Sequence, residues 1–107
     1  MKLIKIATDY SDTPVGRYPT DSDYNGERFR EEFLTPALRA HDEVVVDIDD
    51  VEGFGSSFLE ESFGGLVRKG YFTAAQLHGH LTIRCEDAEL DLYRRLIWKY
   101  IDEAHTD

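Results

Sequence analysis

Short apolar runs bounded by turn residues predict the strands of this chain. Leu3 to Ala7 is the first run, and Val15 to Pro19 is a short second run that is expected to pair back on it. Glu43 to Ile48 holds three consecutive valines without alternation, which is typical of a central strand covered on both faces. Leu81 to Cys85 alternates apolar and polar residues, as a half-buried strand does. The pattern therefore predicts four strands.

Apolar residues at helical spacing predict three long helices and one short one. The first runs from about Glu27 to Ala40 and contains Pro36, which is expected to bend or break it. The second is expected from about Ser57 to Lys69. A capping-box pattern at the segment Thr73 to Gln76 predicts a short helix through Leu77. The last helix is expected from near Asp87 to about Ala104.

The predicted second helix carries clear end signals. Ser57 and Glu60 match the S-x-x-E capping box at its start, and Gly70 is a natural terminator. Gly64 and Gly65 inside it each cost about 1 kcal/mol relative to alanine. Close approach of this helix to the sheet, or to a partner, would offset that cost.

Strands and helices alternate after an initial hairpin, which favours an α/β fold. The expected architecture is a small sandwich with a mixed four-stranded sheet and helices packed on it, in the order β-β-α-β-α-(α)-β-α. At 107 residues the chain fits one domain, residues 1–107. Hydrophobic residues make up 41% and aromatic residues 12%, a composition typical of globular proteins.

Charge and cysteine content exclude several function classes. Acidic residues outnumber basic ones 22 to 12, so the net charge of -10 disfavours binding to nucleic acid or to anionic lipid. A partner with a basic face is favoured instead. Cys85 is the single cysteine, which excludes an intramolecular disulfide and a thiolate metal cage within the chain. The charged N-terminus does not resemble a signal peptide, and no apolar run approaches membrane-spanning length, so a cytoplasmic location is expected.

The segment from Val44 to Glu61 is the most informative part of the chain. It is predicted to form a buried strand, a glycine-bounded turn and a helix that begins with two serines. Hydroxyl groups at a helix start lie beside unpaired backbone N–H groups and the positive end of the helix dipole, where a phosphate is tolerated. Ser57 is best explained as a helix cap, whereas Ser56, one position outside, is expected to project to solvent.

With these residues in place, the chain resembles the STAS-like proteins, an uncharacterised family related to the STAS domains of bacterial anti-sigma factor antagonists. The resemblance includes Gly16-Arg17, the segment Gly26 to Glu31 and the segment Val46 to Phe58. In the antagonists an Asp-Ser-Ser/Thr-Gly motif lies at the same strand-to-helix turn. Its first serine, or a threonine in some members, is phosphorylated by a partner anti-sigma factor with a GHKL-type ATPase fold.

The resemblance implies that Ser56 is the phosphoacceptor and that Ser57 is the second hydroxyl. Gly55 stands where the antagonists carry aspartate, and Phe58 stands where they carry glycine. The function expected is therefore a non-enzymatic regulatory module that binds a GHKL-type ATPase or kinase and is switched by serine phosphorylation. The residues expected to meet the partner are Gly53, Phe54, Gly55, Ser56, Ser57, Phe58 and Glu61.

A phosphate on Ser56 would add about -1.5 to -2 charges. Glu52, Glu60 and Glu61 are close in sequence, so repulsion would oppose docking of an acidic or closely packed partner. A second hypothesis is a domain that binds a small molecule or nucleotide and holds its anionic group at the same helix start. Ser56, Ser57 and the backbone amides of Gly55 through Phe58 would form that site.

Other candidate chemistry is better explained by ordinary structural roles. Alternation places Asp47 and Asp49 on one face of their strand and Asp50 on the other, which disfavours a magnesium site. His78, His80 and the lone cysteine fall short of a structural zinc set. No Ser/His/Asp arrangement or glycine-rich phosphate loop occurs at a usable spacing. Neither an enzymatic activity, nor a metal, nor a cofactor is expected.

Overall fold

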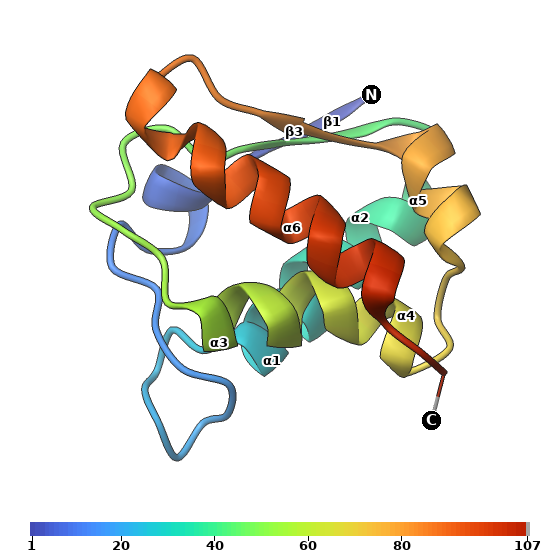
Figure 1. The fold of residues 1–107 in the computed structure, drawn as a ribbon, viewed down its shortest axis with the longest axis horizontal. Coiled ribbons are helices and arrows are strands. Elements are labelled where there is room, and N and C mark those ends of the chain that lie inside the picture. The colour runs from blue at the N-terminus through green and yellow to red at the C-terminus, as the bar shows by residue number, and fades with distance from the viewer. Residues whose placement is uncertain (107) are drawn as a thin grey trace.

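The computed structural model describes residues 1–106, and its sheet has three parallel strands. The strands β1 (Lys2–Lys5), β2 (Val44–Asp47) and β3 (Leu81–Arg84) lie in the order β1-β2-β3 (Figure 1). Leu3 is beside Val45, and Val45 is beside Thr82. β2 is the central strand that its valine run predicted. The α/β class is confirmed, but the prediction of a mixed, four-stranded sheet is wrong.

The missing strand is the segment Val15–Pro19, which forms a loop against the start of the first helix. Its backbone groups are paired there: Val15 N–H donates to the Tyr24 carbonyl, and the Gly16 carbonyl accepts from Gly26 N–H. Gly16 has φ +85°, and a Cβ on it would lie 2.5 Å from the Asp21 Cβ. This left-handed turn interrupts the extended backbone that pairing with β1 requires.

The first helix is continuous and begins one residue before its predicted start. Three segments with helical dihedral angles follow one another in it: α1 (Gly26–Phe29), η2 (Arg30–Leu34) and α2 (Thr35–Ala40). Asn25 caps it by accepting the Arg28 N–H. Pro36 does not break the helix, because the π-helical turn η2 ends at Leu34, two residues before the proline. The wider turn keeps the proline ring away from the carbonyl of the preceding turn.

The second helix also contains a π-helical turn. Its segments are α3 (Ser56–Leu59), η3 (Glu60–Gly64) and α4 (Gly65–Arg68). The residue that caps it is Gly55, with no side-chain hydrogen bond, so the predicted capping box of Ser57 and Glu60 is wrong. The Glu60 carboxylate pairs with Arg17 and Arg68 instead.

Four other helical segments complete the fold of residues 1–106. α5 (Ala74–His80) begins with the predicted capping box, in which the Thr73 side chain accepts the Gln76 N–H and the Gln76 side chain accepts the Thr73 N–H. After β3 come η4 (Ala88–Leu90) and α6 (Asp91–Glu103), and η1 (Ile6–Tyr10) is a single π-helical turn after β1. None of the helices in residues 1–106 is long and apolar enough to cross a membrane.

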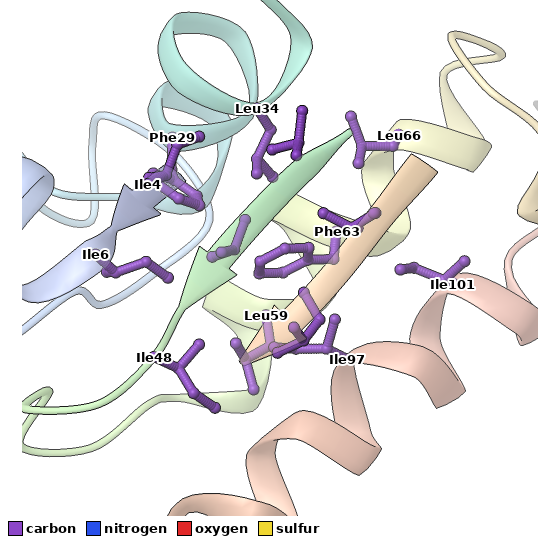
Figure 2. Close-up of a cluster of buried hydrophobic side chains, with 14 of the residues drawn as sticks. Ile4, Ile6, Phe29, Leu34, Ile48, Leu59, Phe63, Leu66, Ile97 and Ile101 are labelled. Atoms are coloured by element: carbon purple, nitrogen blue, oxygen red, sulfur yellow. The ribbon is translucent and has the colours of Figure 1, made fainter. Parts of the chain in front are cut away.

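The core lies between one face of the sheet and the long helices, which Figure 1 shows on the same side of the strands. Ile4, Val46 and Ile83 contribute the inner face of the sheet, and all three are buried. Phe29 and Phe63 from the two π-containing helices meet there with ring centroids 6.2 Å apart. Figure 2 shows this cluster together with Ile97 and Ile101 of α6.

Glycines allow the two π-containing helices to approach closely. A Cβ on Gly26 would lie 2.8 Å from the Phe58 carbonyl oxygen. A Cβ on Gly65 would overlap the guanidinium of Arg30, which is 1% exposed. A Cβ on Gly64 would lie 2.8 Å from a carboxylate oxygen of Glu60. The paired glycines Gly64 and Gly65 were expected to let this helix approach the sheet or a partner. Instead they make room for the charged side chains of Glu60 and Arg30.

Replacing Gly65 with alanine is expected to destabilise the fold although the position is helical. The new methyl group must displace a buried arginine, and such overpacking costs about 1–3 kcal/mol. Gly79→Ala in α5 is the matched control, because a Cβ there meets nothing within 4 Å. That variant is expected to gain up to about 1 kcal/mol from helix propensity. Urea unfolding measures the stability change of each variant. Equal stabilisation by the two alanines would contradict the close contact between Gly65 and Arg30.

Candidate functional site

The corner between β2 and α3, residues 48–55, is held by buried anchors. Ile48, Val51 and Phe54 are all buried. Asp50 turns the chain with φ +67°, and Glu52 N–H donates to the Asp12 carbonyl at 2.9 Å. These contacts fix the direction in which the chain enters the helix.

The two serines stand in the open at the start of that helix. Gly55, Ser56 and Ser57 are exposed, and the helix begins at Ser56. Within residues 1–106, neither serine hydroxyl makes a hydrogen bond. Ser57 therefore does not act as the cap, and both hydroxyls lie beside the N–H groups of the first helical turn. The corner thus presents two hydroxyls rather than one.

Other residues expected to meet a partner are buried beneath the corner. Phe54, Phe58 and Glu61 are 8%, 0% and 1% exposed. The Phe54 ring stacks on Phe58 with centroids 6.1 Å apart and meets the edge of Tyr93 at 5.3 Å. These residues support the corner from inside. The surface that remains for direct contact consists of Gly53, Gly55, Ser56 and Ser57.

A hollow of about 440 Å³ lies beside the serines. Pro14, Val15, Gly53 and Tyr93 contribute to its lining, and Val15 is 52% exposed. Sequence reasoning missed this hollow because it assigned Val15 to a strand and Tyr93 to a helix core. Its charged lining residue is Glu52, so the hollow does not favour an anionic ligand.

The helix behind the serines is fixed by a network of buried and half-buried charges. Arg30 Nη1 donates to the Glu61 carboxylate and to the Glu61 carbonyl, both at 2.6 Å. The other Glu61 oxygen lies 3.1 Å from Arg68 Nη2. Arg17, from the loop after η1, donates to Glu60 at 2.5 Å. Arg30 and Glu61 are both 1% exposed, so this pair belongs to the core.

The arginines change the electrostatics expected at the corner. Burial alone would raise the pKa of Glu61, but the hydrogen bond from Arg30 and the charge of Arg68 outweigh burial and leave this pKa below its ordinary value. Glu60 is likewise paired, with Arg17 and Arg68. The repulsion expected between a phosphate and these two glutamates is therefore largely offset, and Asp50 and Glu52 are the exposed acids of the corner.

Two carboxylates at the end of β2, those of Asp47 and Asp49, have structural partners. Asp49 accepts the backbone N–H groups of Glu86 and Asp87, at 2.9 Å and 3.0 Å, and these bonds lower its pKa. Asp47 accepts the Asp49 N–H at 2.8 Å. The acidic cluster thus connects the end of β2 to the end of β3.

The two histidines of α5 also serve as packing contacts. His78 stacks on Trp98 with ring centroids 4.4 Å apart and lies 2.7 Å from Asp102. His80 Nδ1 is 2.7 Å from the Asp42 carbonyl. Among residues 1–106, no three His, Cys, Asp or Glu side chains are grouped so that they could hold a metal ion.

Comparison with known proteins gives one match. A family model described as "STAS-like domain of unknown function (DUF4325)" matches residues 25–87, more than half of the chain. The matched segment begins at the Asn25 cap and contains both π-containing helices, β2, β3 and the serine corner. Searches of curated proteins and of solved structures found no match.

Removing one partner of the buried ion pair is expected to be costly. Glu61→Leu leaves the buried Arg30 guanidinium with the more exposed Glu31 as its remaining carboxylate partner, which should lower the free energy of unfolding by about 3–5 kcal/mol. The double variant Arg30→Met/Glu61→Leu removes both charges and should lose less than the sum of the single variants. Glu32→Gln, in the exposed pair with Arg28, is the control and should change stability by less than about 1 kcal/mol. Additive losses in urea unfolding would contradict a coupled pair.

Acid is expected to weaken the fold through Glu61. Its pKa is lower in the folded protein than the ordinary value of 4.5. The stabilisation that ionised Glu61 provides is therefore fully present above pH 4.5 and is lost as the pH falls through the lower pKa of Glu61 in the folded protein. The wild type should lose more stability than Glu61→Gln between about pH 7 and about pH 3. Urea midpoints across this range measure the difference; parallel pH profiles would show that Glu61 is not the group responsible.

Proposed function

This chain belongs to the family of STAS-like domains of unknown function, and from that premise we propose that it is a non-enzymatic regulatory module. In this proposal it binds a protein partner through Gly53, Gly55, Ser56 and Ser57. The observation that carries the proposal is the exposure of both serines at the start of a helix that begins after a fixed corner. A pair of hydroxyls in that position is accessible to a modifying enzyme.

The rigidity of the corner supports a role in recognition. Phe54 and Phe58 pack beneath the serines, and the buried Arg30–Glu61 pair holds the same helix from behind. A surface that is already ordered loses little conformational entropy when a partner binds. The corner therefore presents the serines in one geometry before and after docking.

We further propose that phosphorylation of Ser56, with Ser57 as the second acceptor, switches the interaction. Likeness to anti-sigma factor antagonists favours a GHKL-type ATPase or kinase as the partner. A phosphate at the first position of a helix is electrostatically favourable, so the helix stays formed. Its effect falls on the partner, through bulk and through charge placed beside the exposed Glu52. With Gly55 at the position where the antagonists carry aspartate, recognition of the serine relies on the surrounding backbone and hydroxyls.

The switch is testable with a GHKL-type ATPase from the same genome, the protein and ATP-Mg²⁺. We expect intact-mass spectrometry to show one added phosphate on the wild type. We expect none on the double variant Ser56→Ala/Ser57→Ala, with the single variants identifying the acceptor. Ser56→Asp should weaken partner binding at least tenfold, which corresponds to about 1.4 kcal/mol. Thr20→Ala, at an exposed loop hydroxyl, is the control.

Two results separate the parts of this proposal. Equal partner binding by the wild type and by both serine variants, with no phosphate gained, would contradict both the phosphorylation switch and the corner as the docking surface. Binding that is lost in Ser56→Asp without any phosphorylation would keep the corner as the docking surface and remove the kinase.

A further inference from the structure

The hollow beside the two serines has a lining that indicates what it can bind. It lies between the loop after η1, the corner between β2 and α3, and α6. Figure 1 shows this loop beside the corner, and the hydrogen bond from Glu52 N–H to the Asp12 carbonyl joins the two segments. Gly55, which directly precedes Ser56, belongs to the lining. A side chain held in the hollow would therefore lie next to the first serine.

The apolar walls of the hollow are fixed before anything binds. The backbone of Val15 is held on both sides, because its N–H donates to the Tyr24 carbonyl at 3.1 Å and its carbonyl accepts from the Ser22 hydroxyl at 2.6 Å. The Tyr93 ring is held against Phe54, as described above. Val15 is nevertheless 52% exposed. An ordered apolar surface that is open to solvent can bind a side chain of a partner at little entropic cost.

The carboxylate of Glu52 gives the hollow an uncompensated negative charge. The carboxylates of Glu60 and Glu61 are both paired with arginines. Within residues 1–106, by contrast, the exposed Glu52 carboxylate makes no hydrogen bond and no ion pair, and no lysine or arginine lines the hollow. Asp12 and Asp50, which flank Glu52, are exposed as well. The hollow thus combines apolar walls with a charge that a cation would complement.

We propose that this hollow receives an arginine side chain of the protein partner that docks at the serine corner. The methylene groups of the arginine would pack on Val15 and Tyr93, and its guanidinium would pair with Glu52. Arginine suits such a site because its stem is apolar, its head is always charged, and its planar guanidinium also stacks on aromatic rings. The inference rests on the proposed function, since the arginine belongs to the partner proposed there.

The position of the hollow also bears on the phosphorylation switch. Phosphate oxygens bind guanidinium groups through paired, charge-assisted hydrogen bonds. A phosphate on Ser56 would compete with Glu52 for the same guanidinium and draw the arginine away from the apolar walls. Phosphorylation would then weaken docking even though the partner is basic at this point.

Butylguanidinium, a guanidinium on a four-carbon chain, is a probe of the hollow that requires no partner. Titrated into the wild type and followed by NMR, it should shift the signals of Val15, Gly53 and Tyr93, with a dissociation constant on the order of 10 mM. Butyrate, which carries a carboxylate instead, should shift none of them. Glu52→Gln should weaken butylguanidinium binding about threefold. Glu103→Gln is the matched control, since Glu103 is an exposed acid at the end of α6 that does not line the hollow.

Three results overturn the inference. The first is that butylguanidinium leaves the signals of the hollow unchanged. The second is that signals shift over the whole surface, as general attraction of a cation to a chain of net charge -10 would produce. The third is equal binding by the wild type and Glu52→Gln. Val15→Ser removes an apolar wall without changing the charge and is the second variant if Glu52→Gln does not fold.

The GHKL-type ATPase used above separates this inference from the proposed function. When it binds, Ser56→Asp and Glu52→Gln should both weaken binding, whereas Glu103→Gln should not. Binding that is weakened by Ser56→Asp but unchanged in Glu52→Gln overturns the arginine site and keeps the corner as the docking surface. An ATPase that does not bind, together with butylguanidinium bound in the hollow, removes that class of partner and supports the hollow as an arginine site.

Discussion

The buried ion pair between Arg30 and Glu61 is the constraint on which the packing of the two central helices depends. Ionised groups are costly to bury unless each is paired and hydrogen-bonded. Arg30 satisfies this condition by donating to both the carboxylate and the backbone carbonyl of Glu61. Both residues lie in π-helical turns, where the carbonyl positions differ from those of a regular α-helix. Gly65 leaves the space that the guanidinium occupies.

The same network extends from the core to the surface corner. Arg68 and Arg17 continue the pairing outward from Glu61 to Glu60, and Arg17 comes from the loop that replaces the expected second strand. The backbone carbonyl of Asp12, in the same loop, accepts the Glu52 N–H. The serine helix is thereby connected, through Glu60 and Glu61, to the core and to a distant segment of the chain. In the proposed switch, a charge added at the serines would therefore act on the partner directly, without a change of shape in the domain.

Local sequence patterns predicted most of the secondary structure. The valine run identified the central strand, and Thr73 with Gln76 identified the start of α5, because these signals depend on neighbours in sequence. The errors came from long-range partners. Arg17 pairs with Glu60 across 43 residues, and the backbone of Val15 bonds to Tyr24 instead of β1. The sequence pattern predicted where the corner lies and that its serines are exposed. It did not predict the burial of Glu61, because a charged residue is normally expected at the surface. The costly Gly64-Gly65 pair was the one local signal of that buried site.

The valine run of β2 predicted more burial than the strand has. Continuous apolar residues indicate a strand with both faces covered, yet the helices cover the inner face alone. Val46 is 0% exposed on that inner face, whereas Val45 and its neighbour Leu3 lie on the open side. Val45 is partly buried between Leu3 of β1 and Thr82 of β3, so the valine run did not reveal which face of β2 the helices cover.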